Sequence, residues 1–111
     1  MAKYMVLYRS SVPAQEQMAT ASPEQAQEGM AMWMRWAEKA GSAVSDLGSP
    51  LGDSRFVPSG AEAETGTPIG GFSVMEADSA DDVVKLLDDH PHLQAPGGVI
   101  EVLEYLQMPG M

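Results

Sequence analysis

The two histidines of this chain stand beside two carboxylates. His90 directly follows Asp88 and Asp89, and Pro91 separates it from His92. A carboxylate that orients an imidazole and raises its basicity is the usual form of a general base. We expect His92 to be the base, because His90 would be the last residue of a predicted helix. A polar helix C-terminus, where the dipole favours His, is the alternative interpretation.

Five further side chains are candidates for substrate binding. Arg9 and Arg55 could hold an anionic substrate by a forked contact, or could form surface ion pairs. Tyr8 could supply a hydroxyl inside the fold. Met30 and Trp33, three residues apart on a predicted helix, could line an apolar pocket or belong to the core.

We expect neither a metal nor a cofactor. A His-X-His pair binds a divalent ion only if the fold supplies further ligands. The glycine-rich segments lack the phosphate-loop pattern and its lysine, so no nucleotide site is predicted.

Composition limits the class of protein. The 111 residues include no cysteine and carry a formal net charge of −10, and 44% of them are hydrophobic. The size and hydrophobic content predict one domain over residues 1–111, with a loose tail at 107–111. The negative charge disfavours nucleic acid and anionic membrane surfaces as partners. We expect an acidic cytoplasmic protein.

The predicted elements begin with a strand at residues 3–9 that is apolar on both faces. Residues 10–22 show little pattern and are predicted to be a loop. Ser22, Pro23 and Gln25 form a capping box that starts a helix ending before Gly41. The expected buried stripe of this helix leaves Trp36 outside and comprises Ala26, Met30, Trp33, Met34, Ala37 and Ala40.

The second half of the chain repeats the pattern. Short strands are predicted at 42–47 and 55–57, with a hairpin tip at 59–67 and a further strand at 70–77. Ser79 should cap a second helix that ends near His90, before a last strand at 99–106. This order matches the ferredoxin-like βαββαβ unit, an α+β fold with an antiparallel sheet.

Two helices cover only one face of a four-stranded sheet. The first strand is apolar on both faces, so its second face needs a cover. A second copy of the chain is the simplest cover, since closed two-fold dimers are the commonest oligomers. The sequence therefore predicts a homodimer that forms a dimeric α/β barrel.

Ordered segments of the chain resemble those of the YCII-related, or DGPF-domain, proteins. The segments are 3–8, 68–72, 76–79, 90–93 and 97–102. The resemblance implies a ferredoxin-like fold paired into a dimeric α/β barrel. It also implies relatives that are enzymes using a His and an Asp, with one branch associated with dehydrochlorination of aromatic compounds.

The chain departs from that family at two places. Residues 59–62 read Ser-Gly-Ala-Glu where the DGPF branch has Asp-Gly-Pro-Phe, and Met30 lies where the YCII branch has a His. Both departures weaken the transfer of a catalytic role.

Two functions from different classes are consistent with these residues. The first is an enzyme that moves a proton on a small aromatic or enolisable compound, with His92 as base and Asp88 or Asp89 as the orienting group. The second is a non-catalytic ligand-binding or accessory dimer. A third possibility is a haem- or flavin-using monooxygenase, which has the same dimeric barrel. Since a fold does not determine a function, this possibility rests on analogy alone.

Overall fold

Four antiparallel strands form a single sheet in the computed structural model, which describes residues 1–60 and 68–109. β1 lies in the interior of the sheet and pairs with both β3 and β4. The sheet order is β2-β3-β1-β4. The strands are β1 (Ala2–Arg9), β2 (Val44–Pro50), β3 (Ile69–Ala77) and β4 (Val99–Glu104).

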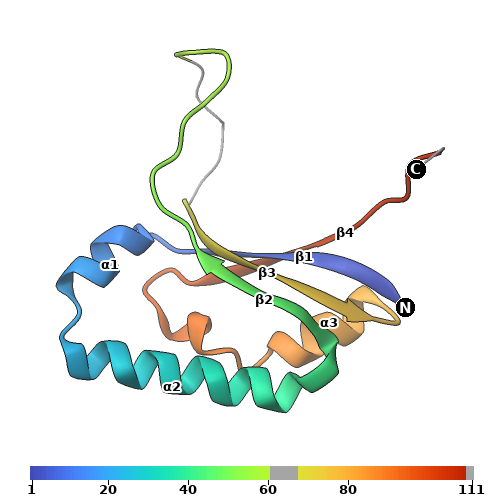
Figure 1. Ribbon diagram of the computed structural model, residues 1–111, viewed down its shortest axis with the longest axis horizontal. Helices are drawn as coiled ribbons and strands as arrows, with labels where there is room; N and C mark the ends of the chain where they lie inside the picture. Colours follow the sequence, from blue (N-terminus) through green and yellow to red (C-terminus); the bar gives the residue numbers. More distant parts are fainter. Residues whose placement is uncertain (61–67, 110–111) are drawn as a thin grey trace.

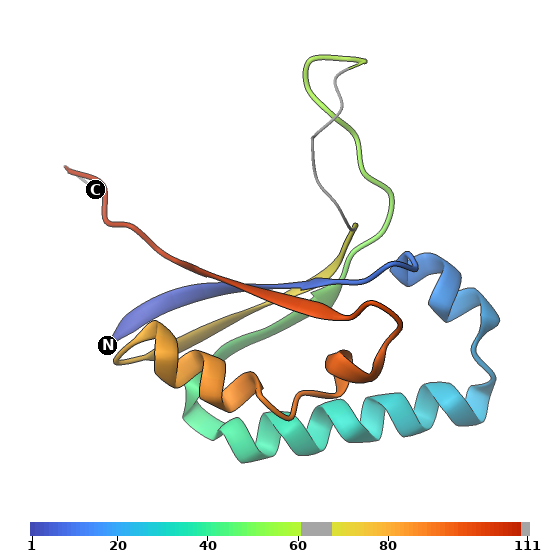
Figure 2. The ribbon, with the colours of Figure 1, turned by 180° about the vertical axis from the view of Figure 1, so that it is seen from behind.

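The helices lie on one side of this sheet (Figures 1 and 2). The long α2 (Pro23–Ala40) connects β1 to β2, and α3 (Ala80–Leu87) connects β3 to β4. The order and the pairing confirm the predicted ferredoxin-like α+β fold. The short elements are α1 (Ala14–Thr20) and the 3-10 helices η1 (Gly41–Ala43) and η2 (Pro91–Gln94).

The ends of α2 follow the sequence pattern. The Ser22 hydroxyl accepts the Gln25 backbone N–H at 3.1 Å, and the Gln25 side chain accepts the Ser22 N–H at 2.9 Å. Two N–H groups that the helix itself cannot satisfy are thereby bonded. Gly41 ends the helix at a φ of 60°, a backbone conformation that other residues rarely adopt.

The core lies between the inner face of the sheet and the helices. Alternate residues of β1 and β3 point inward, as the two-residue period of a strand requires. The buried apolar residues are Tyr4, Val6, Tyr8, Trp36, Met75, Ala77, Val83 and Leu87. Ser10, Ser73 and His90 are the buried polar residues within the described chain.

The outer face of the sheet is apolar, and the described helices do not cover it. Met5 pairs with Val74 on one side and Leu103 on the other. Leu7 pairs with Phe72 on β3. These three neighbours, together with Met5 and Leu7 of β1, present partly exposed hydrophobic side chains, with Leu103 43% exposed.

Residues 51–60 extend from β2 on the outer side of the sheet (Figure 1). No strand forms at 55–57, so that prediction was wrong. Val57 is 95% exposed and pairs with none of the described strands. Residues 61–67 of the predicted hairpin tip lie outside the described residues.

Three other predictions about local structure were wrong. The loop 10–22 contains α1, which buries no residue and so leaves no apolar pattern in the sequence. α3 ends at Leu87, not near His90. On α2, Trp36 is buried, whereas Met30 and Met34 are 62% and 51% exposed, so the buried face of the helix is not the predicted stripe.

Candidate active site

An aromatic cage surrounds His90 between the sheet and α2. We use the name for Tyr8 of β1 with Trp33 and Trp36 of α2. The Tyr8 ring stacks on the His90 imidazole with centroids 4.9 Å apart and planes 26° apart. Both indoles meet the imidazole edge-on at 4.4 Å. His90 is 1% exposed.

The hydrogen bonds of His90 determine its tautomer. Its Nδ1 accepts the backbone N–H of His92 at 3.0 Å, across the turn that Pro91 begins. Because Nδ1 is an acceptor, the proton of the neutral ring lies on Nε2. Burial lowers the pKa of His90 from 6.5 to about 4, the nearby His92 adds to that lowering, and Asp89 opposes it. His90 is therefore neutral near pH 7.

His90 Nε2 has no hydrogen-bond partner. It is the one buried side-chain nitrogen or oxygen in this situation among residues 1–60 and 68–109. A buried N–H without an acceptor costs about 1–3 kcal/mol. The aromatic π faces around it are weak acceptors at best.

In His92 the bonded ring nitrogen is Nε2, whereas in His90 it is Nδ1. Its Nε2 donates to the backbone carbonyl of Arg9 at 2.7 Å, at the end of β1. The ring is partly exposed and lies 5.3 Å from the Tyr8 ring. With the proton on Nε2, the lone pair of the neutral ring is on Nδ1, which bonds to none of the described residues. This is the arrangement of an oriented base.

Tyr8 belongs to a buried hydroxyl chain. The Ser73 hydroxyl donates its single proton to the carbonyl of Leu47 at 2.6 Å. The Tyr8 hydroxyl, 2.8 Å from Ser73 Oγ, must therefore be the donor in that pair. Burial raises the pKa of Tyr8 to about 12, although the bond to Ser73 lowers it. Tyr8 is thus a neutral phenol near pH 7.

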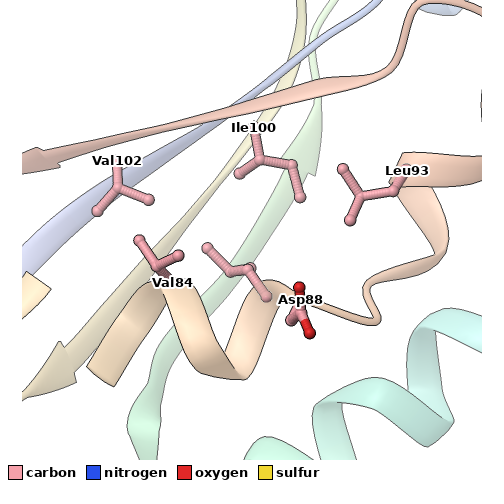
Figure 3. A pocket seen from close by; sticks show the side chains of 6 residues that line it. Val84, Asp88, Leu93, Ile100 and Val102 are labelled. Carbon is pink, nitrogen blue, oxygen red and sulfur yellow. The ribbon is translucent and has the colours of Figure 1, made fainter. Parts of the chain in front are cut away.

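Two small open pockets flank the segment that carries the histidines. One, of about 170 Å³, lies between α3 and β4, where Ile100 and Val102 point toward Val84 and the Asp88 carboxylate lies at the edge (Figure 3). The other, of about 210 Å³, lies beside α2 and is lined by Met32, Arg35, Trp36, Lys39, Asp89 and Pro91. Neither histidine lines either pocket.

Comparison with known proteins identifies the family. The model of the YCII-related domain matches residues 3–109. The chain belongs to the YCII-related family. No curated protein matches this YCII-related chain.

A solved structure with a similar fold is the 5-chloro-2-hydroxyhydroquinone dehydrochlorinase TftG from Burkholderia phenoliruptrix AC1100, in complex with 2,5-dihydroxybenzoquinone. The TM-score is 0.53, the sequence identity is 20%, and the match covers 95% of each chain. At this identity the likeness shows the fold.

Neither aspartate forms a hydrogen bond with a histidine ring. Asp89 pairs with Lys39 of α2, whose hydrogen bond lowers the pKa of that carboxyl group. Asp88 is the C-cap residue that follows α3, and it is exposed. The group that orients His92 is the carbonyl of Arg9 instead.

The predicted substrate-binding residues of this YCII-related protein are dispersed. Tyr8 and Trp33 lie in the cage, but Met30 is exposed on α2. The Arg9 side chain binds Glu101 at 3.0 Å. Arg55 is exposed in the extended segment 51–60, and its Nη1 donates to the Ser54 carbonyl.

Sequence reasoning missed Trp36 and Ser73. Trp36 follows Trp33 by three residues, a helical spacing that could have placed both on one face. Ser73 alternates with Met75 on β3, which marks it as inward-facing. The described residues contain no group of three or more His, Asp or Glu placed to hold a metal ion. Within the same part of the chain, the helices are too short or too polar to cross a membrane.

Proposed function

We propose that this YCII-related protein is an enzyme that moves a proton on a small, hydroxylated aromatic or otherwise enolisable compound. The observation that carries the proposal is the orientation of His92. Its Nε2–H is held by the Arg9 carbonyl, its Nδ1 keeps a lone pair, and the residue is partly exposed. A base needs this combination of a defined tautomer and access.

The proton transfer uses only groups of the chain. His92 Nδ1 takes the proton from an acidic O–H or C–H of the substrate, and the electron pair stays on the substrate as an enolate or phenolate. The resulting imidazolium keeps its Nε2–H bond to the Arg9 carbonyl. This hydrogen bond is stronger than before, because its donor is now a cation. Return of the proton to another atom completes a tautomerisation. Where the substrate bears a halogen, its departure as halide completes an elimination.

The family and the structural neighbour support an oxygenated six-membered ring as the substrate class. The neighbour is a dehydrochlorinase of a chlorinated hydroxyhydroquinone, and its complex holds a dihydroxybenzoquinone. The aromatic cage beside His92 is suited to stack on such a ring. The net charge of −10 disfavours large anionic substrates.

The variant that tests the base is His92→Gln. Glutamine can still donate an N–H to the Arg9 carbonyl, but it has no basic nitrogen. We expect turnover of 5-chloro-2-hydroxyhydroquinone, followed as chloride release, to fall by about 10²–10⁴-fold. Binding of 2,5-dihydroxybenzoquinone should change much less.

Equal turnover by the wild type and His92→Gln would refute the role of His92. Met30→Gln is the matched control, because Met30 is exposed on α2 and should leave turnover unchanged.

We further propose that the protein is a homodimer paired through the outer face of its sheet. The apolar ladder Val74–Met5–Leu103, with Leu7 and Phe72 beside it, is contiguous across three strands, unlike singly scattered surface hydrophobics. A second copy would cover this face with the same ladder by two-fold symmetry.

The assembly is tested with a charge on the outer face. Leu7→Lys should shift the mass measured by light scattering from two chains to one. Met34→Lys, on the helix side, should leave two chains. A wild-type protein that is monomeric at tens of micromolar would refute the pairing.

A non-catalytic ligand-binding dimer is the second candidate. It is favoured by the dense aromatic packing around His90 and by pockets that neither histidine lines. Tight binding of 2,5-dihydroxybenzoquinone without turnover of any chlorinated or enolisable ring would select this candidate.

A further inference from the structure

The unpaired N–H of His90 is the least satisfied polar group of the described core. The ring is 1% exposed, Nδ1 is used by the backbone of His92, and Nε2 is bonded to nothing. Proteins satisfy most buried donors, so an unpaired one calls for an explanation. A donor kept ready for a ligand is one such explanation.

The surroundings of the donor determine which ligand would fit. Three aromatic rings enclose the imidazole, from Tyr8, Trp33 and Trp36. Such walls favour a flat ring, and an N–H favours an oxygen acceptor. A neutral imidazole can stabilise negative charge on a ligand oxygen by donating its N–H. Because the ring carries no charge, it gives up no ion pair when it does so.

Of the two tryptophans in the cage, Trp33 is less firmly held than Trp36. The Trp36 indole N–H donates to the Leu86 carbonyl at 2.8 Å, and the residue is buried. Trp33 is partly exposed, and its indole N–H bonds to none of the described residues. A ring that displaced Trp33 would make the same edge contacts with Tyr8 and His90 that Trp33 makes now.

We propose that His90 binds the ligand, donating its Nε2–H to a phenolate or quinone oxygen of a planar ring that enters at Trp33. His90 is then the donor of the site and His92 its base. This inference rests on the proposed function, because both require a small oxygenated ring as ligand.

Two substitutions separate this role from a purely structural one. In His90→Asn, the side-chain oxygen can still accept the His92 N–H across the turn, but the side chain is too short to reach the position of Nε2. In His90→Gln, the amide can reach that position and donate there.

The probe is 2,5-dihydroxybenzoquinone, titrated by calorimetry into the wild type and both variants. We expect His90→Asn to weaken binding at least 10-fold and His90→Gln to recover part of the loss. In the wild type, the imidazole Nε2–H resonance of His90 should move on binding, which a structural histidine would not show.

Three results would overturn the inference, and they have different meanings. If His90→Asn binds as the wild type does, or if the Nε2–H resonance stays in place on binding, His90 is not the donor and the proposed function stands. If the folded wild type binds neither 2,5-dihydroxybenzoquinone nor simple phenols, the ligand class fails, and both proposals fail with it.

Discussion

Acidification should destabilise this protein through His90. Burial in the aromatic cage holds the pKa of His90 at about 4, against 6.5 for the free imidazole. Between these two values the unfolded chain binds a proton that the folded chain does not. Stability therefore falls as the pH drops below 6.5 and levels off below about 4.

The size of this effect follows from the two pKa values. The full difference corresponds to about 3 kcal/mol of unfolding free energy, and about 2 kcal/mol of it is lost by pH 5. The figure is large against the ~5–15 kcal/mol by which domains are usually stable. His90 is almost completely buried, so solvent screening does little to reduce it.

The assay is urea unfolding at pH 7.5, 6 and 5, at one protein concentration, for the wild type and His90→Asn. Asparagine keeps the acceptor for the His92 N–H and does not titrate. Protonation of the 16 carboxylates affects both proteins alike and cancels in the difference. The stability of the wild type relative to His90→Asn should therefore fall by about 2 kcal/mol between pH 7.5 and pH 5.

A difference between the two proteins that stays constant with pH would refute the reasoning. His90 would then titrate equally in the folded and unfolded chains, and the cage would not exclude water from the ring.

Two further predictions concern the buried polar groups. Ser73→Ala removes the partner of both the Tyr8 hydroxyl and the Leu47 carbonyl, so it should cost about 1–3 kcal/mol in urea unfolding. Adding Tyr8→Phe to it should cost less than the sum of the single changes, and strict additivity would contradict the chain of hydrogen bonds. Trp36→Phe leaves the Leu86 carbonyl without its indole donor and should lower stability by about 1–3 kcal/mol, with far-UV circular dichroism unchanged; a stability equal to that of the wild type would contradict that bond.

Local signals were enough to predict the main elements of the fold. The Ser22–Gln25 capping box and Gly41 located both ends of α2, and alternation located β1. These signals lie within a few residues of one another in sequence, where capping and strand periodicity operate. The order of the elements then restricted the topology to the ferredoxin-like α+β fold.

The environment of the histidines could not be predicted in the same way. The sequence placed His90 and His92 beside two aspartates and predicted an Asp–His pair. In the structure, α3 ends three residues before His90, so the chain turns His90 into the core and leaves Asp89 outside with Lys39. His90 and Asp89 are neighbours in sequence, but one side chain points into the core and the other toward the surface.

By itself, the sequence determined which elements form and which residue types were available for chemistry, because both depend on local propensity and composition. Only the tertiary structure decided that His90 would be neutral and caged, and that a backbone carbonyl would orient His92. Both rings have partners from β1, more than 80 residues earlier, and the His90 ring also has partners from α2, more than 50 residues earlier. The pKa and tautomer of an imidazole depend on such distant neighbours, which no local pattern encodes.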